Sequence, residues 1–266
     1  MRIDVSVVVT FYNMENFVHE TINSIISDES NIQLILIDDC STDSTREKIN
    51  EFVKNHKKIN IDYVIHFNDV NSGVSVSRNI GIELAKGTYL TFLDGDDLLF
   101  KNSISKRLER LKSSGASLIY GNYIRIDQSS KILSGPVYIK KNGKYKDLLK
   151  TNFIAIGSGM IRLDDLREIR FKNVKSEDYL FWLEYTKTNK KIVYLDDSVM
   201  KYRIIKNSRS KNKSIKKILV IIDIYLVYRN LNYPRYISMY YSIIYLINRL
   251  FVKGLLTRIK NLGGMR

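Results

Sequence analysis

The sequence predicts an α/β protein, a doubly wound and mostly parallel sheet followed by a C-terminal helical extension. Short apolar segments rich in Val and Ile alternate with segments of helical periodicity four times within residues 1–120. This alternation is typical of a parallel sheet that carries helices on its faces. Polar clusters follow the apolar segments, whereas residues 211–266 are basic and apolar. In such sheets ligands bind beyond the carboxyl ends of the strands, so the functional residues are expected there.

The first half of the chain contains the clearest elements. Val5–Thr10 is apolar on both faces, as in a central parallel strand, and residues 15–27 place Phe17, Ile22 and Ile25 at helical spacing. Further strands are expected at Leu34–Ile37, Ile61–Phe67, Tyr89–Leu93 and Leu118–Tyr120, and further helices over residues 44–54, 74–86 and 103–113.

The alternation weakens in the second half. Residues 128–145 contain two Gly-containing turn pairs, which predict turns or a hairpin. Ser176 is placed as the N-cap of a helix that continues to residue 188. Two short strands are expected at Val193–Leu195 and Val199–Tyr202.

Composition excludes several classes of protein. With 44% apolar and 27% charged residues among 266, the chain is neither disordered nor collagen-like. The single Cys, Cys40, excludes an internal disulfide and fits a reducing compartment, and one Cys with three His excludes the usual zinc sites. The first residues lack the features of a signal peptide, so we expect a cytoplasmic protein.

The positive charge is concentrated near the C-terminal end. The net charge is +15, and residues 201–266 hold 15 Lys and Arg against one acid, Asp223. Residues 1–200 hold 28 basic and 27 acidic residues, so the body of the protein is nearly neutral. An anionic partner is therefore expected for the tail rather than for the body.

The strongest chemical signal is Asp94-Gly95-Asp96 at the end of a predicted strand. Two carboxylates around a small residue can hold Mg²⁺ or Mn²⁺ together with substrate phosphates, and Gly95 leaves room for a ligand near the backbone. The alternative is a solvated acidic turn.

Other strand ends carry residues suited to a nucleotide. Tyr12 can stack on a base, Asp39 can accept hydrogen bonds from a base or ribose, and Arg78 can meet a phosphate or orient the acids. Taken singly, each also fits a structural role, namely packing, a turn acid or a surface ion pair of little energy.

Four blocks of sequence together carry a family resemblance. They read VSVVVTFYNMENF, LILIDDCSTDST, NSGVSVSRNIGIELAKGTYLTFLDGDD and SEDYLF. In this order and spacing they resemble family 2 glycosyltransferases of GT-A fold, of the type that builds bacterial surface polysaccharide or O-antigen. The resemblance covers residues 3–210. It implies a catalytic domain over 1–210, with a nucleotide-binding half (1–100) and an acceptor-binding half (101–210).

The resemblance also implies roles for individual residues. Thr10, Tyr12 and Asp39 match positions that hold the uracil and ribose of a UDP-sugar, and Arg78 matches the Arg of the turn-helix block. Asp94 and Asp96 match the step that binds the metal and the diphosphate, with Asp96 as the direct ligand.

Asp178 matches the catalytic base of an inverting sugar transfer to a saccharide hydroxyl. Because Asp178 stands in the first turn of a predicted helix, the helix dipole is expected to keep it ionised, with a low pKa.

One position departs from the family pattern. Ile205 stands where many relatives carry a His that can contact the metal or the diphosphate. We therefore expect either fewer protein ligands for the metal or neutralisation of the diphosphate by Arg203 and Lys206.

The basic tail, residues 211–266, combines apolar segments with flanking Lys and Arg and with many Tyr. Its uncharged segment, 236–248, is 13 residues long, which is too short to span a bilayer. Amphipathic helices of this kind suit an anionic membrane surface, and a lipid-linked acceptor would explain them. The alternative is a pair of helices packed on the catalytic domain or on a second subunit.

Two other functions remain open from the residues alone. A nucleotidyltransferase shares the sheet and the acidic ligands, but Thr10–Glu15 has neither Gly nor Lys or Arg to form a phosphate loop. A nucleic-acid binder would use the tail, but the tail is too apolar and the clustered carboxylates repel phosphates. We therefore expect no nucleic-acid partner.

Overall fold

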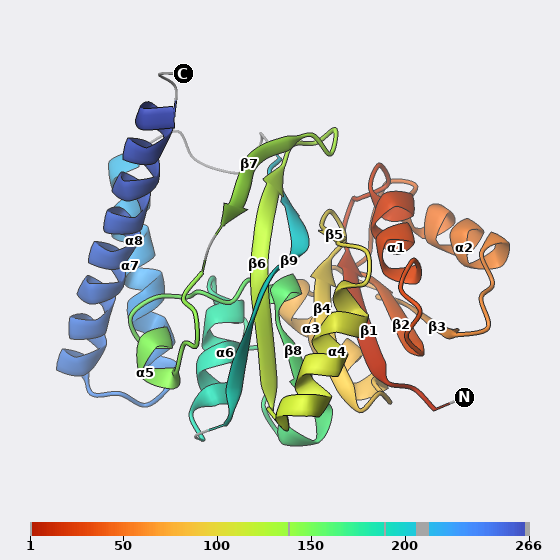
Figure 1. The fold of residues 1–266 in the computed structure, drawn as a ribbon, viewed down its shortest axis with the longest axis horizontal. Coiled ribbons are helices and arrows are strands. Elements are labelled where there is room, and N and C mark those ends of the chain that lie inside the picture. The colour runs from red at the N-terminus through yellow and green to blue at the C-terminus, as the bar shows by residue number, and fades with distance from the viewer. Residues whose placement is uncertain (1, 138, 189, 206–212, 264–266) are drawn as a thin grey trace.

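The computed structural model of the chain describes residues 2–137, 139–188, 190–205 and 213–263, and within 213–218 and 250–263 it describes the backbone alone. Its described residues form one nine-stranded sheet with helices on both sides (Figure 1). The strands are β1 (Val5–Phe11), β2 (Ile32–Asp38), β3 (Ile61–Phe67), β4 (Tyr89–Asp94), β5 (Leu98–Leu99), β6 (Leu118–Ile126), β7 (Ile132–Val137), β8 (Met160–Arg162) and β9 (Ile192–Arg203).

The sheet is mostly parallel, as predicted. Its strand order is β3-β2-β1-β4-β8-β6-β9-β5, with β7 paired to β6. Strands β1 to β4 pair in parallel, and so do β6 and β9, whereas β8 runs antiparallel to both β4 and β6. The carboxyl ends of β1, β2 and β4 therefore lie next to one another.

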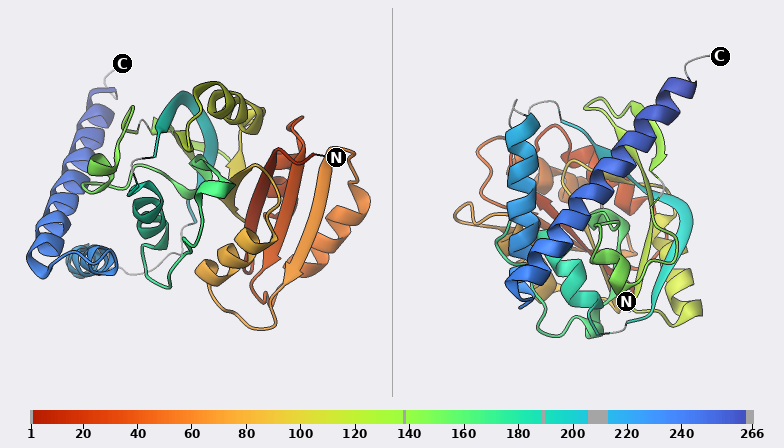
Figure 2. Two further views of the ribbon diagram at one scale, coloured as in Figure 1. Left: turned by 90° about the horizontal axis from the view of Figure 1, so that it is seen from below. Right: turned by 90° about the vertical axis from the view of Figure 1, so that its left-hand side faces the viewer.

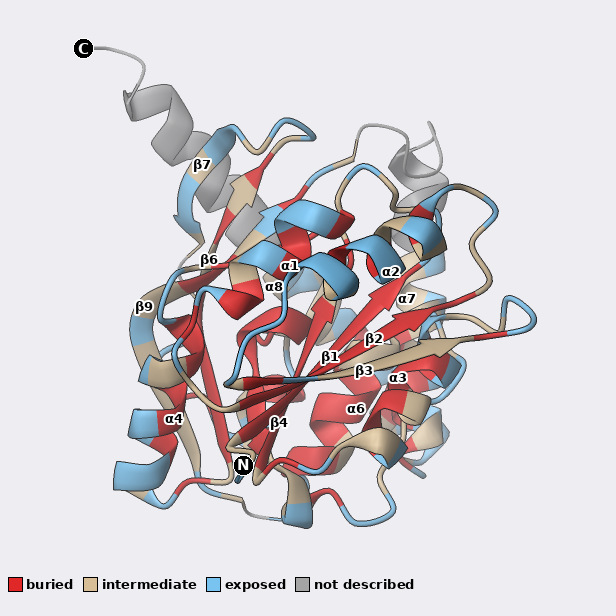
Figure 3. Ribbon diagram, turned by 90° about the vertical axis from the view of Figure 1, so that its right-hand side faces the viewer, coloured by how far each residue is buried: buried red, intermediate tan, exposed pale blue. Residues whose placement is uncertain are grey.

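Helices cover both faces of this sheet (Figure 3). They are α1 (Val18–Ile26), α2 (Thr45–Asn55), α3 (Val74–Leu84), α4 (Ser103–Ser114), α5 (Tyr145–Leu148), α6 (Glu177–Thr186), α7 (Lys213–Asn230) and α8 (Arg235–Gly263), with short 3₁₀ turns η1 (Ile156–Ser158) and η2 (Leu163–Asp165).

The alternation of side chains along the strands separates two cores. Val7 and Val9 of β1 pack with α1, α2 and α4, whereas Val8 packs with residues of α3 and α6 on the other face. Helix α3 approaches β1 closely at Gly81, where a Cβ atom would stand 2.3 Å from Val8 Cγ1. Because strands such as β1 are apolar and covered on both faces, the first elements of the chain could be predicted from the sequence.

The second half differs from the predictions in detail. Strand β6 continues to Ile126, six residues beyond the predicted end, because it pairs with β9 along its whole length. The two strands predicted in the region of β9 are one strand with register shifts opposite Asn122. Ser176 does occupy the N-cap of α6, but its side chain makes no capping hydrogen bond.

The C-terminal helices pack on the side of α5 and α6 (Figure 2). The Tyr228 hydroxyl lies 2.9 Å from that of Tyr179, and the Tyr145 and Tyr233 hydroxyls lie 3.0 Å apart. Lys175 pairs with Asp223 of α7 at 3.6 Å. The predicted helices are confirmed, and one face of them packs on the domain that contains the sheet. Across the described residues, none of the helices has the length and apolarity needed to cross a bilayer.

Candidate active site

Three strand ends create the candidate site. Thr10 pairs in register with Asp94, and Asp39 directly follows β2. A cavity of about 440 Å³ opens beyond these ends, and we call it the first cavity. Its lining includes all the residues predicted to bind the donor or the metal, which are Thr10, Tyr12, Asp39, Arg78, Asp94 and Asp96.

The turn after β4 is fixed by the backbone around it. Gly95 donates its N–H to Thr10 O at 2.9 Å, and Thr21 donates its hydroxyl to Gly95 O at 2.9 Å. A Cβ atom on Gly95 would stand 2.4 Å from Phe11 Cδ1. Glycine is therefore needed here because Phe11 lies against it, and Gly95 also lines the first cavity, so the expectation that it leaves room for a ligand stays a prediction.

The acids of this turn carry an excess of negative charge. Burial and the nearby Asp94 raise the pKa of Asp96 to about 6. Burial, Asp94 and Asp96 raise the pKa of Asp97 well above its usual value, and among the described residues its Oδ2 atom has no hydrogen-bond partner. Such a turn is electrostatically suited to an incoming cation.

Arg203 holds this turn from behind. Its Nε donates to Asp96 O at 2.6 Å, Nη2 pairs with Glu20 at 2.8 Å, and Nη1 donates to Asp127 O at 3.0 Å. The guanidinium is fully buried. The expectation that Arg203 neutralises a diphosphate is therefore wrong, because its donors are used within the protein. Lys206 lies outside the described residues.

Arg78 connects two groups of acids. Its Nη2 pairs with Asp94 Oδ1 at 2.7 Å, and its Nη1 pairs with Glu177 Oε1 at 3.0 Å. Burial lowers the pKa of Arg78, but Asp94 and Glu177 outweigh this effect and raise it. The guanidinium therefore orients the acids, which was one of the two roles predicted for it.

Asp39 is held by hydrogen bonds within the protein, whereas the ring of Tyr12 is exposed. Asp39 is buried and accepts hydrogen bonds from Asn68 Nδ2 at 2.7 Å, Ser72 N at 2.9 Å and Gly73 N at 2.8 Å. It thus fixes the loop before α3, where Gly73 has φ 86°. Tyr12 is 44% exposed at the rim of the first cavity, where its ring is free to stack on a planar group.

A second cavity of about 240 Å³ adjoins the first, and Asp178 lines it. The two cavities share Arg78, Asp94 and Glu177. Asp178 Oδ1 accepts from its neighbour Tyr179 N at 2.7 Å, and Oδ2 accepts from Asn152 Nδ2 at 3.1 Å. Burial and Glu177 raise the pKa of Asp178 to about 6. The predicted low pKa is therefore wrong, because burial outweighs the helix dipole here.

The sequence profile of Glycosyl transferase family 2 matches residues 6–170. The chain belongs to this family. An uncharacterized glycosyltransferase of Haemophilus influenzae is 33% identical over 92% of this chain and 95% of its own length. The Escherichia coli enzyme WfgD, named as a UDP-Glc:α-D-GlcNAc-diphosphoundecaprenol β-1,3-glucosyltransferase, is 30% identical over 79% of this chain and 80% of its own.

Solved structures confirm the GT-A fold. Staphylococcus aureus TarS in complex with UDP-GlcNAc superposes with a TM-score of 0.68 at 16% identity, over 92% of this chain and 72% of TarS. The Pyrobaculum calidifontis mannosyltransferase PcManGT, in complex with GDP-Man and Mn²⁺, superposes with a TM-score of 0.65 at 12% identity, over 100% of this chain and 82% of its own. This family 2 glycosyltransferase therefore has the predicted fold and family.

The residues of the site fit a divalent cation that completes its shell with substrate. In the described part of the chain, no three His, Cys, Asp or Glu side chains form a ready metal cluster. Mg²⁺ and related cations commonly bind through only one or two carboxylates plus substrate phosphates. Asp94 and Asp96 supply two carboxylates, and the unpartnered Asp97 Oδ2 lies next to them in sequence.

Several residues around Asp178 were missed by the sequence analysis. Asn152 and Lys175 come from separate segments, and no motif marks them, whereas Tyr202 was predicted only as the end of a strand. Glu177 lies in the SEDYLF block beside Asp178, but the sequence analysis did not predict its ion pair with Arg78. These positions depend on how distant segments pack, which a single sequence does not reveal.

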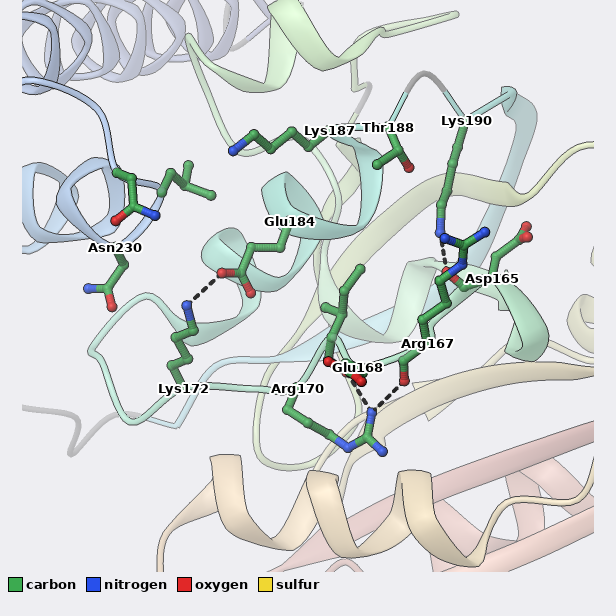
Figure 4. A pocket seen from close by; sticks show the side chains of 13 residues that line it. Asp165, Arg167, Glu168, Arg170, Lys172, Glu184, Lys187, Thr188, Lys190 and Asn230 are labelled. Carbon is green, nitrogen blue, oxygen red and sulfur yellow. Dashed lines mark hydrogen bonds and ion pairs between the residues drawn. The ribbon is translucent and has the colours of Figure 1, made fainter.

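A larger hollow of about 1010 Å³ lies elsewhere, between α6 and the turn from α7 to α8 (Figure 4). Its lining mixes basic and acidic side chains, and Lys172 pairs with Glu184 at 2.7 Å inside it. None of the predicted site residues lines this hollow. Its size therefore does not identify it as the reaction centre.

Proposed function

We propose that this family 2 enzyme is an inverting, metal-dependent glycosyltransferase. It moves a sugar from a UDP-sugar to a hydroxyl of a lipid-linked saccharide in surface-polysaccharide synthesis. The observation that carries this proposal is the shared wall of the two cavities. The predicted donor residues line one cavity, Asp178 lines the other, and Arg78, Asp94 and Glu177 border both.

In this arrangement the two halves of residues 1–210 bind different substrates. Residues 1–100 supply the donor side, with Tyr12 stacking on the uracil while Thr10 and Asp39 line the nucleoside pocket. Residues 101–210 supply the acceptor side, with Asp178 at its centre. An inverting transfer needs a base on the face of the sugar opposite the leaving diphosphate. Two adjoining cavities allow this, because the diphosphate binds in the first and the base lines the second.

Asp178 has the chemistry of a general base. Its pKa of about 6 leaves it mostly ionised at neutral pH while making it a stronger base than an ordinary aspartate. In the proposed step the acceptor oxygen forms a bond to the anomeric carbon as the bond from that carbon to the UDP oxygen breaks. The hydroxyl proton passes to Asp178, and UDP leaves with the bonding electron pair.

Asp94 and Asp96 would hold Mn²⁺ or Mg²⁺ at the donor diphosphate. When bound, the cation supplies charge neutralisation for the departing UDP. The mannosyltransferase PcManGT is named in complex with Mn²⁺, which supports the proposal by fold analogy. Ile205 cannot replace the family His as a ligand, and Arg203 is occupied elsewhere, so the two carboxylates carry the protein's share of the coordination.

The outer face of α7 and α8 fits a peripheral contact with the inner face of the cell membrane. Its exposed apolar side chains are spaced by whole helical turns, namely Leu219, Ile222 and Leu226 on α7 and Tyr236, Met239, Tyr240, Ile243 and Ile247 on α8. Exposed Arg229, Arg235 and Arg249 flank them. Apolar rings and chains beside arginines suit an anionic lipid surface.

A panel of nucleotide-sugars tests the donor. UDP-glucose, UDP-GlcNAc and GDP-mannose are added with Mn²⁺, and Tm and transfer to GlcNAc-diphosphoundecaprenol are measured. A UDP-sugar should raise Tm, because a ligand that binds only the folded state stabilises it. The donor assignment fails when GDP-mannose alone stabilises the protein or when no UDP-sugar does so.

Vesicle flotation tests the membrane contact. A variant with Ile222, Leu226, Ile243 and Ile247 changed to Ser removes apolar surface without opening the core, because all four side chains are about half exposed. It should stay behind while the unmodified protein floats with phosphatidylglycerol vesicles. The control Ile59→Ser changes a 99% exposed side chain outside the tail and should float normally. Equal flotation of the fourfold variant would contradict the contact.

A further inference from the structure

Three successive carbonyls at the C-terminal end of α5 are held by side chains from distant helices. Tyr179 donates its hydroxyl to Leu148 O at 2.5 Å, and Tyr228 of α7 donates to Leu149 O at 2.7 Å. Asn248 of α8 donates its Nδ2 to Lys150 O at 3.1 Å. Helix α6 and the C-terminal helices α7 and α8 therefore fix the backbone of residues 148–150, which we call the anchored segment.

Asn152 follows the anchored segment and faces the proposed base. Its Nδ2 donates to Asp178 Oδ2 at 3.1 Å, while its Oδ1 accepts from Ile154 N at 3.2 Å. The bond to Ile154 orients the amide, because only the oxygen can accept from a backbone N–H. The amide nitrogen is thereby directed at the carboxylate.

We propose that Asn152 is a positioning residue for Asp178, and that the C-terminal helices keep it in place through the anchored segment. This inference rests on the proposed role of Asp178 as the base. The tail is then part of the catalytic body as well as a membrane contact. Tyr179 connects the tail with the proposed base. It is the residue after Asp178, and its hydroxyl lies 2.9 Å from the hydroxyl of Tyr228 in the tail.

The Asn152 bond favours the ionised form of Asp178. An amide N–H can donate to the carboxylate, and hydrogen bonds to a charged group stabilise the charged form. The other charged groups that face Asp178 are Glu177, Arg78 and Asp94, and Lys175 and Asp97 line the same cavity. From the tail, Tyr245 is close enough for the Asp178 charge to raise its pKa, beside the larger effects of burial and Arg249.

Carboxyl NMR tests the inference without any substrate. Protein labelled with ¹³C at the aspartate carboxyls is titrated, and Asp178→Asn identifies the Asp178 signal. Asn152→Ala should raise the Asp178 pKa by about one unit, which is the size expected for a lost hydrogen bond to a charge. Asn152→Asp has nearly the same shape but adds a like charge, so it should raise the pKa further.

Matched variants of the tail test the anchored segment. Asn248→Ala and Tyr228→Phe should raise the Asp178 pKa by a smaller amount. Asn230→Ala should leave it unchanged, because within the described part of the chain Asn230 donates to Leu226 O of its own helix. In transfer assays of Asn152→Ala, the fall of kcat at acid pH should shift to higher pH, while the KM for the donor stays constant.

The possible results separate this inference from the proposed function. Equal Asp178 pKa values in the unmodified protein, Asn152→Ala and Asn152→Asp would overturn the role of Asn152. Unchanged values in Asn248→Ala and Tyr228→Phe would overturn the role of the tail. Full transfer activity of Asp178→Asn would instead remove the base itself, whatever the Asn152 variants show.

Discussion

The proposed donor side and the proposed base side of this protein are built in different ways. On the donor side, Thr10, Asp39 and Asp94 stand at the ends of neighbouring parallel strands, and the sheet alone brings them together. On the base side, Asp178 stands in the first turn of α6 and accepts a hydrogen bond from Asn152, which follows a segment that the C-terminal helices help to fix. The first arrangement depends on local sequence, whereas the second depends on packing between distant segments.

This difference determines how sensitive each side is to side-chain substitutions. The donor side is secured by backbone hydrogen bonds such as Gly95 N to Thr10 O, which most side-chain substitutions leave in place. The base side depends on individual side-chain contacts, so single substitutions there can shift the geometry and charge of Asp178. Catalysis should therefore be more sensitive to changes around the base than donor binding is.

The largest expected effect is a loss of turnover without a loss of donor binding. Asp178→Asn should lower kcat by roughly 10²- to 10⁴-fold, as expected for loss of a general base. Binding of UDP with Mn²⁺ should be unchanged, because Asp178 does not line the first cavity. Single-turnover transfer and a UDP titration of the same variant measure both. A parallel loss of UDP binding would show that the two sides are not separate.

Asp96→Asn should produce the opposite pattern. It should raise the Mn²⁺ concentration needed for half-maximal rate by at least about tenfold, the lower bound for changes even to outer partners of metal ligands. The Tm increase given by UDP with Mn²⁺ should shrink accordingly. Asp62→Asn serves as the control, because Asp62 is an exposed acid on β3 outside both cavities. An unchanged Mn²⁺ dependence in Asp96→Asn would remove Asp96 from the metal site.

The pH dependence sharpens the description of the base. With a pKa of about 6, Asp178 is mostly ionised at pH 7 and mostly protonated at pH 5. Only the ionised form accepts a proton, so kcat at saturating donor and Mn²⁺ should fall about tenfold from pH 7 to pH 5. A rate that stays constant down to pH 4.5 would show an ordinary carboxyl and contradict the effect of burial.

The smallest effect expected is at the rim of the first cavity. Tyr12→Ala should weaken UDP binding by about 1–2 kcal/mol, the usual energy of stacking a base on an aromatic ring. Tyr12→Phe keeps the ring and should bind UDP almost normally. Calorimetric titration with UDP and Mn²⁺ compares them, and equal losses in both variants would assign the effect to the hydroxyl instead.

The sequence predicted that the strand ends of the proposed donor side lie together. Strand ends of a parallel sheet converge by topology, so Thr10, Asp39 and Asp94 could be placed together from the order of the strands alone. The physical reason for Gly95 could not be predicted, because it depends on the Phe11 ring beside it. Arg203 was assigned wrongly for a similar reason, since nothing in the local sequence shows that Glu20 and Asp127 occupy its guanidinium.

The base side was predictable only through family resemblance. Asp178 was named from the SEDYLF block, and the family profile itself ends at residue 170. Its raised pKa comes from burial and from Glu177, and its hydrogen bond to Asn152 joins residues 26 positions apart in the chain. The tail was predicted as helical, but its hydrogen bonds to the anchored segment have no signature in the periodicity of α7 and α8.

A crystal structure with UDP-glucose and Mn²⁺ tests the central claim most directly, because it shows which way the anomeric carbon points. The account predicts the uracil on Tyr12, the diphosphate at Asp94 and Asp96, and the anomeric carbon facing the Asp178 carboxylate with space for one hydroxyl between them. A glucosyl group directed away from the second cavity, with Asp178 on the far side of Arg78 and out of reach, would contradict it.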